Sequence, residues 1–402
     1  MIQLAHRLDL IKPSSSLTAM TRAKALIAAG VDVCNLTAGE PEFATPLHIV
    51  EAAYAALLGG ETKYTSVDGT MALKRAICEK FRRENGLEFD PEQISVGAGA
   101  KQVLYNVLTC TINDGDEVVI PAPYWVSYPD IVRLNGGKPV FIKPQAGQNF
   151  KITPAQLAAA ITPRTKWLLI NSPNNPSGAV YSARELRAIG EVLEDAPHVG
   201  VITDDVYEYL VYDDARFTTF AQANPRLAHR TVTVNSVSKA FAMTGWRLGY
   251  AGASAPLIKE MAKLQSQTSG NPAAVTQAAA VAALQGPRAF VADWNRQYQE
   301  RRDAIVSRLD GKHGLRCPSP QGAFFAYVSC DALMGMTTPG GKRIDTDDDF
   351  VMFLLNDHLV ASVQGSAYGI SPAFRLSFAA SLNVIEKACD RILLACSTLS
   401  RG

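Results

Sequence analysis

One lysine and its neighbours constrain this chain more than any other feature of the sequence. Lys239 follows the apolar run 231–234 and lies among small and hydroxyl-bearing residues. A lysine forms a Schiff base only after it loses its proton, and burial beside other cations lowers the pKa of a lysine enough to allow this. The hydroxyl donors and guanidinium fork suited to a phosphate are Ser236, Ser238 and Arg247. The segment therefore predicts a site for pyridoxal phosphate, which needs a lysine and a phosphate site at fixed spacing.

Composition narrows the class of protein. The 402 residues are 47% hydrophobic, which is enough for a large core and for two domains. Lys and Arg number 39, Asp and Glu number 38, and the formal net charge is +1. Because these charges are scattered and balanced, the sequence argues against nucleic acid or an anionic membrane as a partner.

The cysteines and the N-terminus predict a cytoplasmic protein. The seven cysteines are an odd number without C-x-x-C pairing or metal-ligand spacing, which indicates free thiols in a reducing compartment. Residues 1–12 lack the uninterrupted apolar stretch of a signal peptide. No window approaches the roughly 18 apolar residues of a membrane span.

Short apolar runs alternate with helical patterns through the middle of the chain. The expected strands are 117–120, 167–171, 200–203, 231–235 and 248–251, and the expected helices are 100–112, 127–134 and 182–193. This alternation predicts an α/β fold with a mostly parallel sheet covered on both faces. Most of these strands end in a polar or glycine-rich segment, and ligands of such sheets bind beyond the carboxyl ends of the strands.

A second domain is predicted in the C-terminal part. Residues 287–309 have the pattern of a long polar helix that leads into it. Strands at 322–328 and 374–378 and helices at 347–359 and 382–394 follow. We expect residues 46–290 to form the large domain, and residues 1–45 with 291–402 to form the small one.

Several residues that follow these strands have the chemistry that a pyridoxal phosphate enzyme needs. Asp204 is a carboxylate that can keep the pyridine nitrogen protonated. Tyr207 and Asn175 can donate hydrogen bonds to the ring oxygen, and Trp125 offers a flat surface for stacking. A helix is expected to start at Gly99, Ala100 and Lys101. Its free backbone N–H groups would suit a phosphate.

A carboxylate-binding arginine completes this set. Arg375 can hold a substrate α-carboxylate through two parallel hydrogen bonds. Each of these residues alone has a more common explanation: Lys239 as a solvated lysine, Asp204 as a helix cap, Trp125 as a core residue and Arg375 as a surface ion pair. Their joint order, each after a strand, favours one shared site.

The residues that carry a family resemblance are the segments 35–41, 123–129, 172–178 and 239–249. Together they resemble class I aminotransferases of pyridoxal phosphate fold type I, most closely the Iβ branch of aspartate aminotransferases. The resemblance runs from about Lys12 to the last helix. It implies an α/β large domain with a mostly parallel, seven-stranded type of sheet between helices, and a smaller α+β domain.

The resemblance also implies roles for the cofactor-binding residues. Lys239 is implied to be the Schiff-base lysine and proton shuttle, Asp204 the pyridinium partner, and Tyr207 and Asn175 the donors to the ring oxygen. Trp125 is implied to stack on the ring. The residues implied to line the cofactor phosphate and the mouth of the site are Gly99, Ala100, Lys101, Ser236, Ser238 and Arg247. Tyr64 resembles the tyrosine that reaches the phosphate of a neighbouring subunit, which implies a homodimer with shared active sites.

Substrate binding is implied for a smaller set. Gly39 and Arg375 resemble the groups that hold the α-carboxylate, with Trp125 and Asn175 beside them. The segment 265–272 contains no arginine to bind a side-chain carboxylate from the partner subunit. In the Iβ branch a lysine and a small hydroxyl residue serve instead, and the matching residues here are Lys101, Ser16 and the nearby Lys12.

We therefore expect a transaminase that moves an amino group from L-aspartate to 2-oxoglutarate by a ping-pong mechanism. The alternatives are an aminotransferase for aromatic amino acids or prephenate, and a lyase on the same scaffold. A non-enzymatic pyridoxal phosphate-binding regulator is the remaining hypothesis, but only about 38 residues precede Gly39 and they lack a helix-turn-helix pattern.

Overall fold

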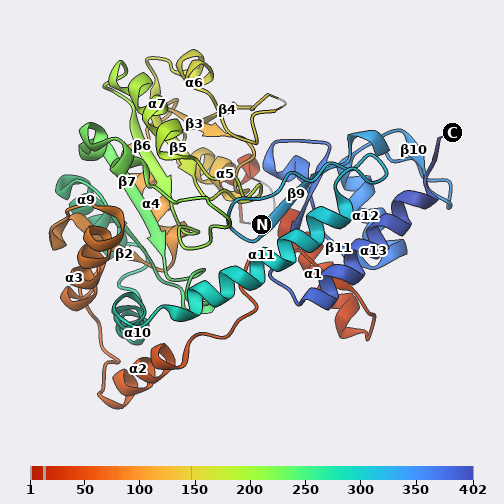
Figure 1. Ribbon diagram of the computed structural model, residues 1–402. Helices are drawn as coiled ribbons and strands as arrows, with labels where there is room; N and C mark the ends of the chain where they lie inside the picture. The colour runs from red at the N-terminus through yellow and green to blue at the C-terminus, as the bar shows by residue number, and fades with distance from the viewer. Residues whose placement is uncertain (1, 12–14, 146, 402) are drawn as a thin grey trace.

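The computed structural model describes residues 2–11, 15–145 and 147–401 (Figure 1). Its largest sheet has seven strands in the order β2-β8-β7-β6-β5-β3-β4. The strands are β2 (Ile94–Gly97), β3 (Glu117–Pro121), β4 (Lys138–Ile142), β5 (Thr165–Asn171), β6 (Gly200–Asp204), β7 (Thr231–Ser236) and β8 (Gly249–Gly252). The strands from β3 to β7 pair in parallel, and β8 is antiparallel to both of its neighbours. The predicted α/β fold with a mostly parallel sheet is confirmed.

Two strands of this sheet were not predicted. β2 has only four residues, which is too short for a clear apolar pattern. β4 lies at the edge of the sheet and begins with Lys138 and Pro139. All of its residues except Ile142 are partly or fully exposed. An edge strand can carry charge and proline because one of its sides needs no backbone partner.

Helices cover both faces of the sheet. Alternate residues of β3 face opposite cores: Val118 and Ile120 pack with α4 (Ala100–Thr111), α5 (Ser127–Leu134) and α9 (Ala255–Ser266). Val119 packs on the other face with α6 (Pro154–Ala160), α7 (Ala183–Glu194) and α8 (Phe220–Ala223). This two-residue alternation between two buried faces explains why the strands are apolar throughout.

The remaining helices lie around this sheet or in the C-terminal part. They are α1 (Ser15–Ala28), α2 (Leu47–Leu58), α3 (Met71–Lys80), α10 (Ala274–Gln285), α11 (Ala289–Leu309), α12 (Asp347–His358) and α13 (Leu382–Thr398). Short 3₁₀ or π turns are at His6–Leu10, Phe81–Asn85, Pro91–Gln93, Pro225–Arg230, Thr244–Trp246, Asp331–Leu333 and Gly365–Tyr368. Among the described residues, no helix combines the length and hydropathy needed to cross a bilayer.

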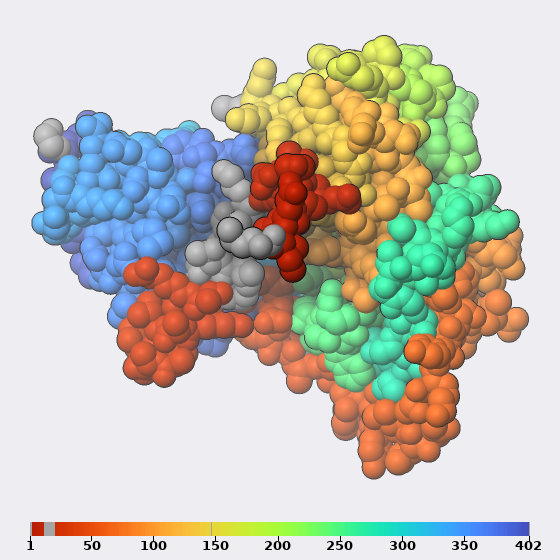
Figure 2. Space-filling view, turned by 180° about the vertical axis from the view of Figure 1, so that it is seen from behind, coloured from red at the N-terminus to blue at the C-terminus, as the bar shows by residue number. Residues whose placement is uncertain are grey.

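The C-terminal part has its own sheet and core. The three-stranded antiparallel sheet β12-β13-β9 joins β9 (Phe325–Ser329), β12 (Val363–Gln364) and β13 (Ala373–Ser377). Two smaller sheets pair β1 (Cys34–Asn35) with β11 (Val360–Ala361), and β10 (Met336–Thr337) with β14 (Ser400–Arg401). The long helix α11 runs from the large sheet toward this part (Figure 1). Residues 2–11, in dark red, lie over the junction between the large-sheet part and the C-terminal part (Figure 2).

Candidate active site

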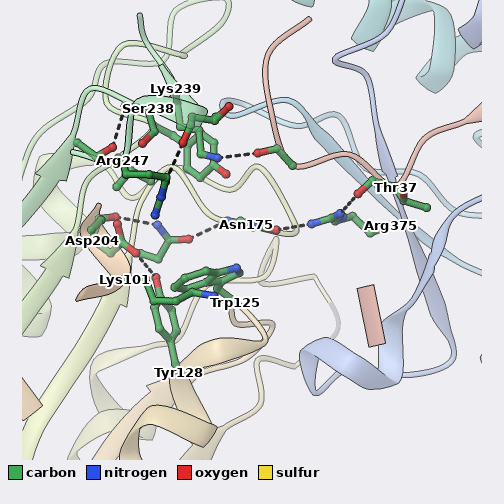
Figure 3. A pocket seen from close by; sticks show the side chains of 17 residues that line it. Thr37, Lys101, Trp125, Tyr128, Asn175, Asp204, Ser238, Lys239, Arg247 and Arg375 are labelled. Atoms are coloured by element: carbon green, nitrogen blue, oxygen red, sulfur yellow. Dashed lines mark hydrogen bonds between the residues drawn. The ribbon is translucent and has the colours of Figure 1, made fainter. Parts of the chain in front are cut away.

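The strand register brings the candidate residues to one edge of the large sheet. Asn171 and Asp204, the last residues of β5 and β6, are direct neighbours. Gly249, the first residue of β8, pairs with Ser236 on one side and with Gly97 on the other. Because β8 is antiparallel, its beginning meets the carboxyl ends of its neighbours. A cavity of about 430 Å³ opens at this edge (Figure 3).

Lys239 extends into this cavity from the segment after β7. Its ammonium Nζ donates to the carbonyl oxygen of Gly39 at 2.6 Å. Burial lowers the pKa of Lys239 to about 8, the carboxylate of Glu40 opposes this, and Arg247 adds to it. A larger fraction of this amine than of an ordinary lysine is therefore neutral and nucleophilic near neutral pH.

Asp204 lies on the floor of the cavity and is 4% exposed. The hydroxyl of Tyr128 donates to its Oδ2 at 2.5 Å, while its buried Oδ1 has no partner among the described residues. Burial raises the pKa of Asp204 to about 6, and hydrogen bonds from Tyr128 and from the Val206 backbone act against this rise. The carboxylate thus stays ionised at neutral pH and leaves one oxygen for a cationic donor.

Arg375 reaches the floor from β13 of the C-terminal sheet. Its guanidinium donates to Asn175 Oδ1 at 3.1 Å and to the Thr37 carbonyl at 2.7 Å, and its buried Nε has no partner among the described residues. Tyr207 lies beside Asn175, and burial raises the pKa of its phenol, so this hydroxyl remains a donor. A fixed arginine beside two polar donors suits a carboxylate ligand.

A second group of residues surrounds the start of α4, and we call it the cradle. It comprises Gly99, Ala100, Ser236, Ser238 and Arg247. A Cβ on Gly99, whose φ is +96°, would lie 2.4 Å from Arg247 Nη2, and a Cβ on Gly249 would lie 2.2 Å from the Ala100 nitrogen. Glycine is therefore required where the arginine and the helix start approach each other. The Gly99 N–H donates to the Gly97 carbonyl at 2.8 Å, so the helix start contributes the Ala100 N–H. Together with two hydroxyls and a guanidinium, this group suits an anion.

Lys101 and Trp125 form the wall between the floor and the entrance. The Lys101 ammonium lies 4.7 Å from the centroid of the Trp125 ring. Burial, and then the charge of Arg247, lower the pKa of Lys101. Trp125 in turn meets the Tyr128 ring edge to face, with the centroids 5.4 Å apart.

The cavity brings together most of the predicted site residues. Those that line it are Gly39, Ala100, Lys101, Trp125, Asn175, Asp204, Tyr207, Ser236, Ser238, Lys239, Arg247 and Arg375. Gly99 adjoins it through Arg247. Tyr64 is 98% exposed and lies away from these residues on this chain. Lys12 and the side chain of Ser16 lie outside what the structure describes, so their predicted roles stay predictions.

Comparison with known proteins agrees with this site. The family model for aminotransferase class I and II matches residues 31–392. The chain belongs to this aminotransferase family. It is 51% identical to the aspartate/prephenate aminotransferase of Cereibacter sphaeroides, over 99% of each chain. It is also 51% identical to an aspartate aminotransferase of Rhizobium meliloti, over 99% of this chain and 97% of that protein.

Solved aminotransferase structures share the whole fold. A crystal structure of the aspartate aminotransferase from Rhizobium meliloti matches with a TM-score of 0.96, 50% identity and full coverage of both chains. The aspartate aminotransferase from Thermus thermophilus with maleate matches with a TM-score of 0.91 and 38% identity, over 98% of this chain and 100% of that one. These matches confirm the fold type I class that the sequence predicted.

The sequence analysis of this aminotransferase missed five residues that line the cavity. They are Thr37, Tyr128, Asn171, Val206 and Thr244. Asn171 links Asp204 to Asn175. Its Nδ2 donates to the Asp204 carbonyl at 2.7 Å, and its Oδ1 accepts from the Asn175 N–H at 2.8 Å. Its position as the last residue of a predicted strand was the available signal. Tyr128 lies within a segment that was assigned a site role only through Trp125.

Proposed function

We propose that the protein is an aspartate aminotransferase, which converts L-aspartate and 2-oxoglutarate to oxaloacetate and L-glutamate. One observation carries the proposal: a lysine with a lowered pKa lies in a cavity that two cations besides Arg247 of the cradle, Arg375 and Lys101, also line. Two cations around a nucleophilic amine suit a dicarboxylate with an α-amino group. The names of the relatives point to the same substrate.

The residues present fit pyridoxal phosphate. The unpartnered Asp204 Oδ1 suits a protonated pyridine nitrogen, and the cradle suits a phosphate. Asn175 and Tyr207 would hold the ring oxygen, Trp125 would cover the ring face, and Lys239 would bind the aldehyde carbon. When bound, the cofactor supplies the electron sink that the side chains of a protein lack.

The chain's own residues would perform the remaining tasks. Arg375 and the Gly39 backbone orient the α-carboxylate, so that the α-hydrogen faces Lys239. Lys239, whose pKa is about 8, can then take and return a proton at the α-carbon. Lys101 would bind the side-chain carboxylate, and Ser16 and Lys12 would assist it from the N-terminal segment.

Prephenate is the second candidate substrate. The Cereibacter sphaeroides relative acts on aspartate and prephenate by its name. The Trp125 ring beside Lys101 offers an apolar surface next to a charge. That combination suits a substrate that carries both a ring and a carboxylate.

We also propose a homodimer with shared active sites. On this chain Tyr64 is 98% exposed, and α2 exposes the apolar side chains Leu47, Val50, Tyr54, Leu57 and Leu58. A protein rarely leaves such a face in water, and a second copy that covered it could receive Tyr64 at its cradle. Sedimentation should give twice the chain mass of 43.3 kDa. A monomeric mass would contradict the shared site.

Two further assignments belong to this proposal. We place residues 46–290 in the large domain and residues 1–45 with 291–402 in the small domain, because α11 leads from one sheet toward the other. We place the protein in the cytoplasm, because all seven cysteines are free thiols.

The decisive experiment uses the cofactor-loaded protein and L-aspartate without an acceptor. A transaminase should release one equivalent of oxaloacetate per site and then stop, and 2-oxoglutarate should restart it. Continuous release of ammonia and an oxo acid would indicate a lyase instead. Release from no amino acid at all would contradict the proposal. Replacing 2-oxoglutarate by prephenate tests the second substrate.

A further inference from the structure

Tyr128 makes the one side-chain hydrogen bond to the Asp204 carboxylate among the described residues. The donor and acceptor oxygens are 2.5 Å apart, and the two residues are 2% and 4% exposed. Burial raises the pKa of the Tyr128 phenol well above its usual value, so this hydroxyl is a permanent donor. The bond therefore occupies Oδ2 and leaves the buried Oδ1 without a partner among the described residues.

One turn carries both Trp125 of the wall and Tyr128. The Tyr128 N–H bonds to the Trp125 carbonyl at 3.0 Å, and their rings meet edge to face. Figure 3 shows Tyr128 below Trp125 with its hydroxyl toward Asp204. The same turn thus fixes the ring wall and the carboxylate.

We propose that Tyr128 is a positioning residue that holds Asp204 ionised and aimed at the pyridine nitrogen. The inference rests on the proposed function, since it concerns the group that faces a bound pyridoxal phosphate. A hydrogen bond to a carboxylate stabilises its charged form, which counteracts the burial of Asp204. The other titratable groups near Asp204 are Lys239, Tyr207 and Asp205. Of these three, only the ammonium of Lys239 favours the charged carboxylate, and the Val206 backbone hydrogen bond favours it as well.

The test compares Tyr128→Phe with Tyr212→Phe, which also removes one buried hydroxyl but one that donates to the backbone of Ala323. Apo-protein is titrated with pyridoxal phosphate. Tyr128→Phe should weaken binding about tenfold, the usual effect of losing a hydrogen bond to a charged group. Tyr212→Phe should leave the affinity unchanged.

A spectroscopic readout separates positioning from packing. Without the hydroxyl, Asp204 binds a proton more readily and the cofactor ring carries less positive charge. The pH midpoint of the absorption change of the bound cofactor should therefore rise in Tyr128→Phe. A loss of packing alone would not move this midpoint.

A double mutant tests whether Tyr128 acts through Asp204. In an Asp204→Asn background, Tyr128→Phe should cause no further loss of affinity, because the effects of substitutions at two coupled residues are not additive. An equal further loss would overturn the proposal, and so would a Tyr128→Phe protein that behaves like Tyr212→Phe. If the wild-type apo-protein bound no pyridoxal phosphate, the proposed function itself would be wrong. The proposed role of Tyr128 would then be wrong as well.

Discussion

The floor of the site and its mouth are built in different ways. The floor consists of Asn175, Asp204 and Tyr207, which follow strands of the large sheet and are at most 6% exposed. The mouth consists of Gly39, Glu40 and Lys101, which belong to a loop and a helix start and are exposed. We infer that the floor fixes which chemistry takes place, and that the mouth adjusts which substrate enters and when the lysine reacts.

Hydrogen bonding separates the two regions further. Two buried atoms, Oδ1 of Asp204 in the floor and Nε of Arg375, which reaches the floor from β13, have no protein partner among the described residues. At the mouth, Glu40 accepts from Thr244 Oγ1 at 2.9 Å and Gly39 accepts from Lys239. A buried polar atom without a partner costs about 1–3 kcal/mol unless a ligand supplies one. Ligand binding should therefore depend on floor residues far more than on mouth residues.

The largest effect should come from Lys239→Ala. Losing the amine that is proposed to bind the cofactor and move the proton should lower kcat/KM by about 10⁴-fold or more. The cradle and Asp204 should still hold pyridoxal phosphate, so equilibrium dialysis should find it bound. Lys263→Ala, at an exposed lysine paired with Glu260, is the matched control. Retained turnover in Lys239→Ala would refute the assigned role.

Arg375→Ala should have the next largest effect. The arginine is 4% exposed and its fork is fixed by Asn175 and Thr37, so its loss removes a preorganised carboxylate site. We expect kcat/KM to fall about 10²- to 10³-fold for every amino donor, mainly through KM. The spectrum of bound cofactor should stay unchanged. An effect confined to dicarboxylates would contradict this role.

The same contrast explains what the sequence could predict. Strands with continuous apolar runs, and the reactive residues directly after them, were readable because both signals are local. The contact of Tyr128 with Asp204 joins residues 76 positions apart, and the contact of Thr244 with Glu40 joins residues 204 apart. Such contacts depend on strand order and loop packing, which leave no periodic pattern in one sequence.

A smaller effect is expected from Lys101→Gln at the mouth. The lysine lies near Arg247 and over the Trp125 ring, where a side-chain carboxylate can reach it. Because losing one hydrogen bond between charged groups costs about 1.5 kcal/mol at the low end, we expect about a tenfold loss of kcat/KM for L-aspartate. Activity toward L-phenylalanine should be unchanged or higher. Lys263→Gln is the control, and equal losses for both donors would show that Lys101 does not select the side chain.

The smallest effect should come from Glu40→Gln. Only the neutral amine of Lys239 reacts with an aldehyde, so the rate at which apo-protein takes up pyridoxal phosphate should rise with pH and level off above about 8. The Glu40 carboxylate stabilises the ammonium and so raises the pKa of Lys239. Removing this charge should move the half-maximal pH downward and speed uptake at pH 7 a few-fold, roughly the effect of one partly screened charge. Glu88→Gln, at an exposed glutamate that does not line the cavity, should leave the profile in place. An unchanged profile in Glu40→Gln, which keeps an oxygen that can accept from Thr244, would mean that the hydrogen bond rather than the charge is what Glu40 contributes.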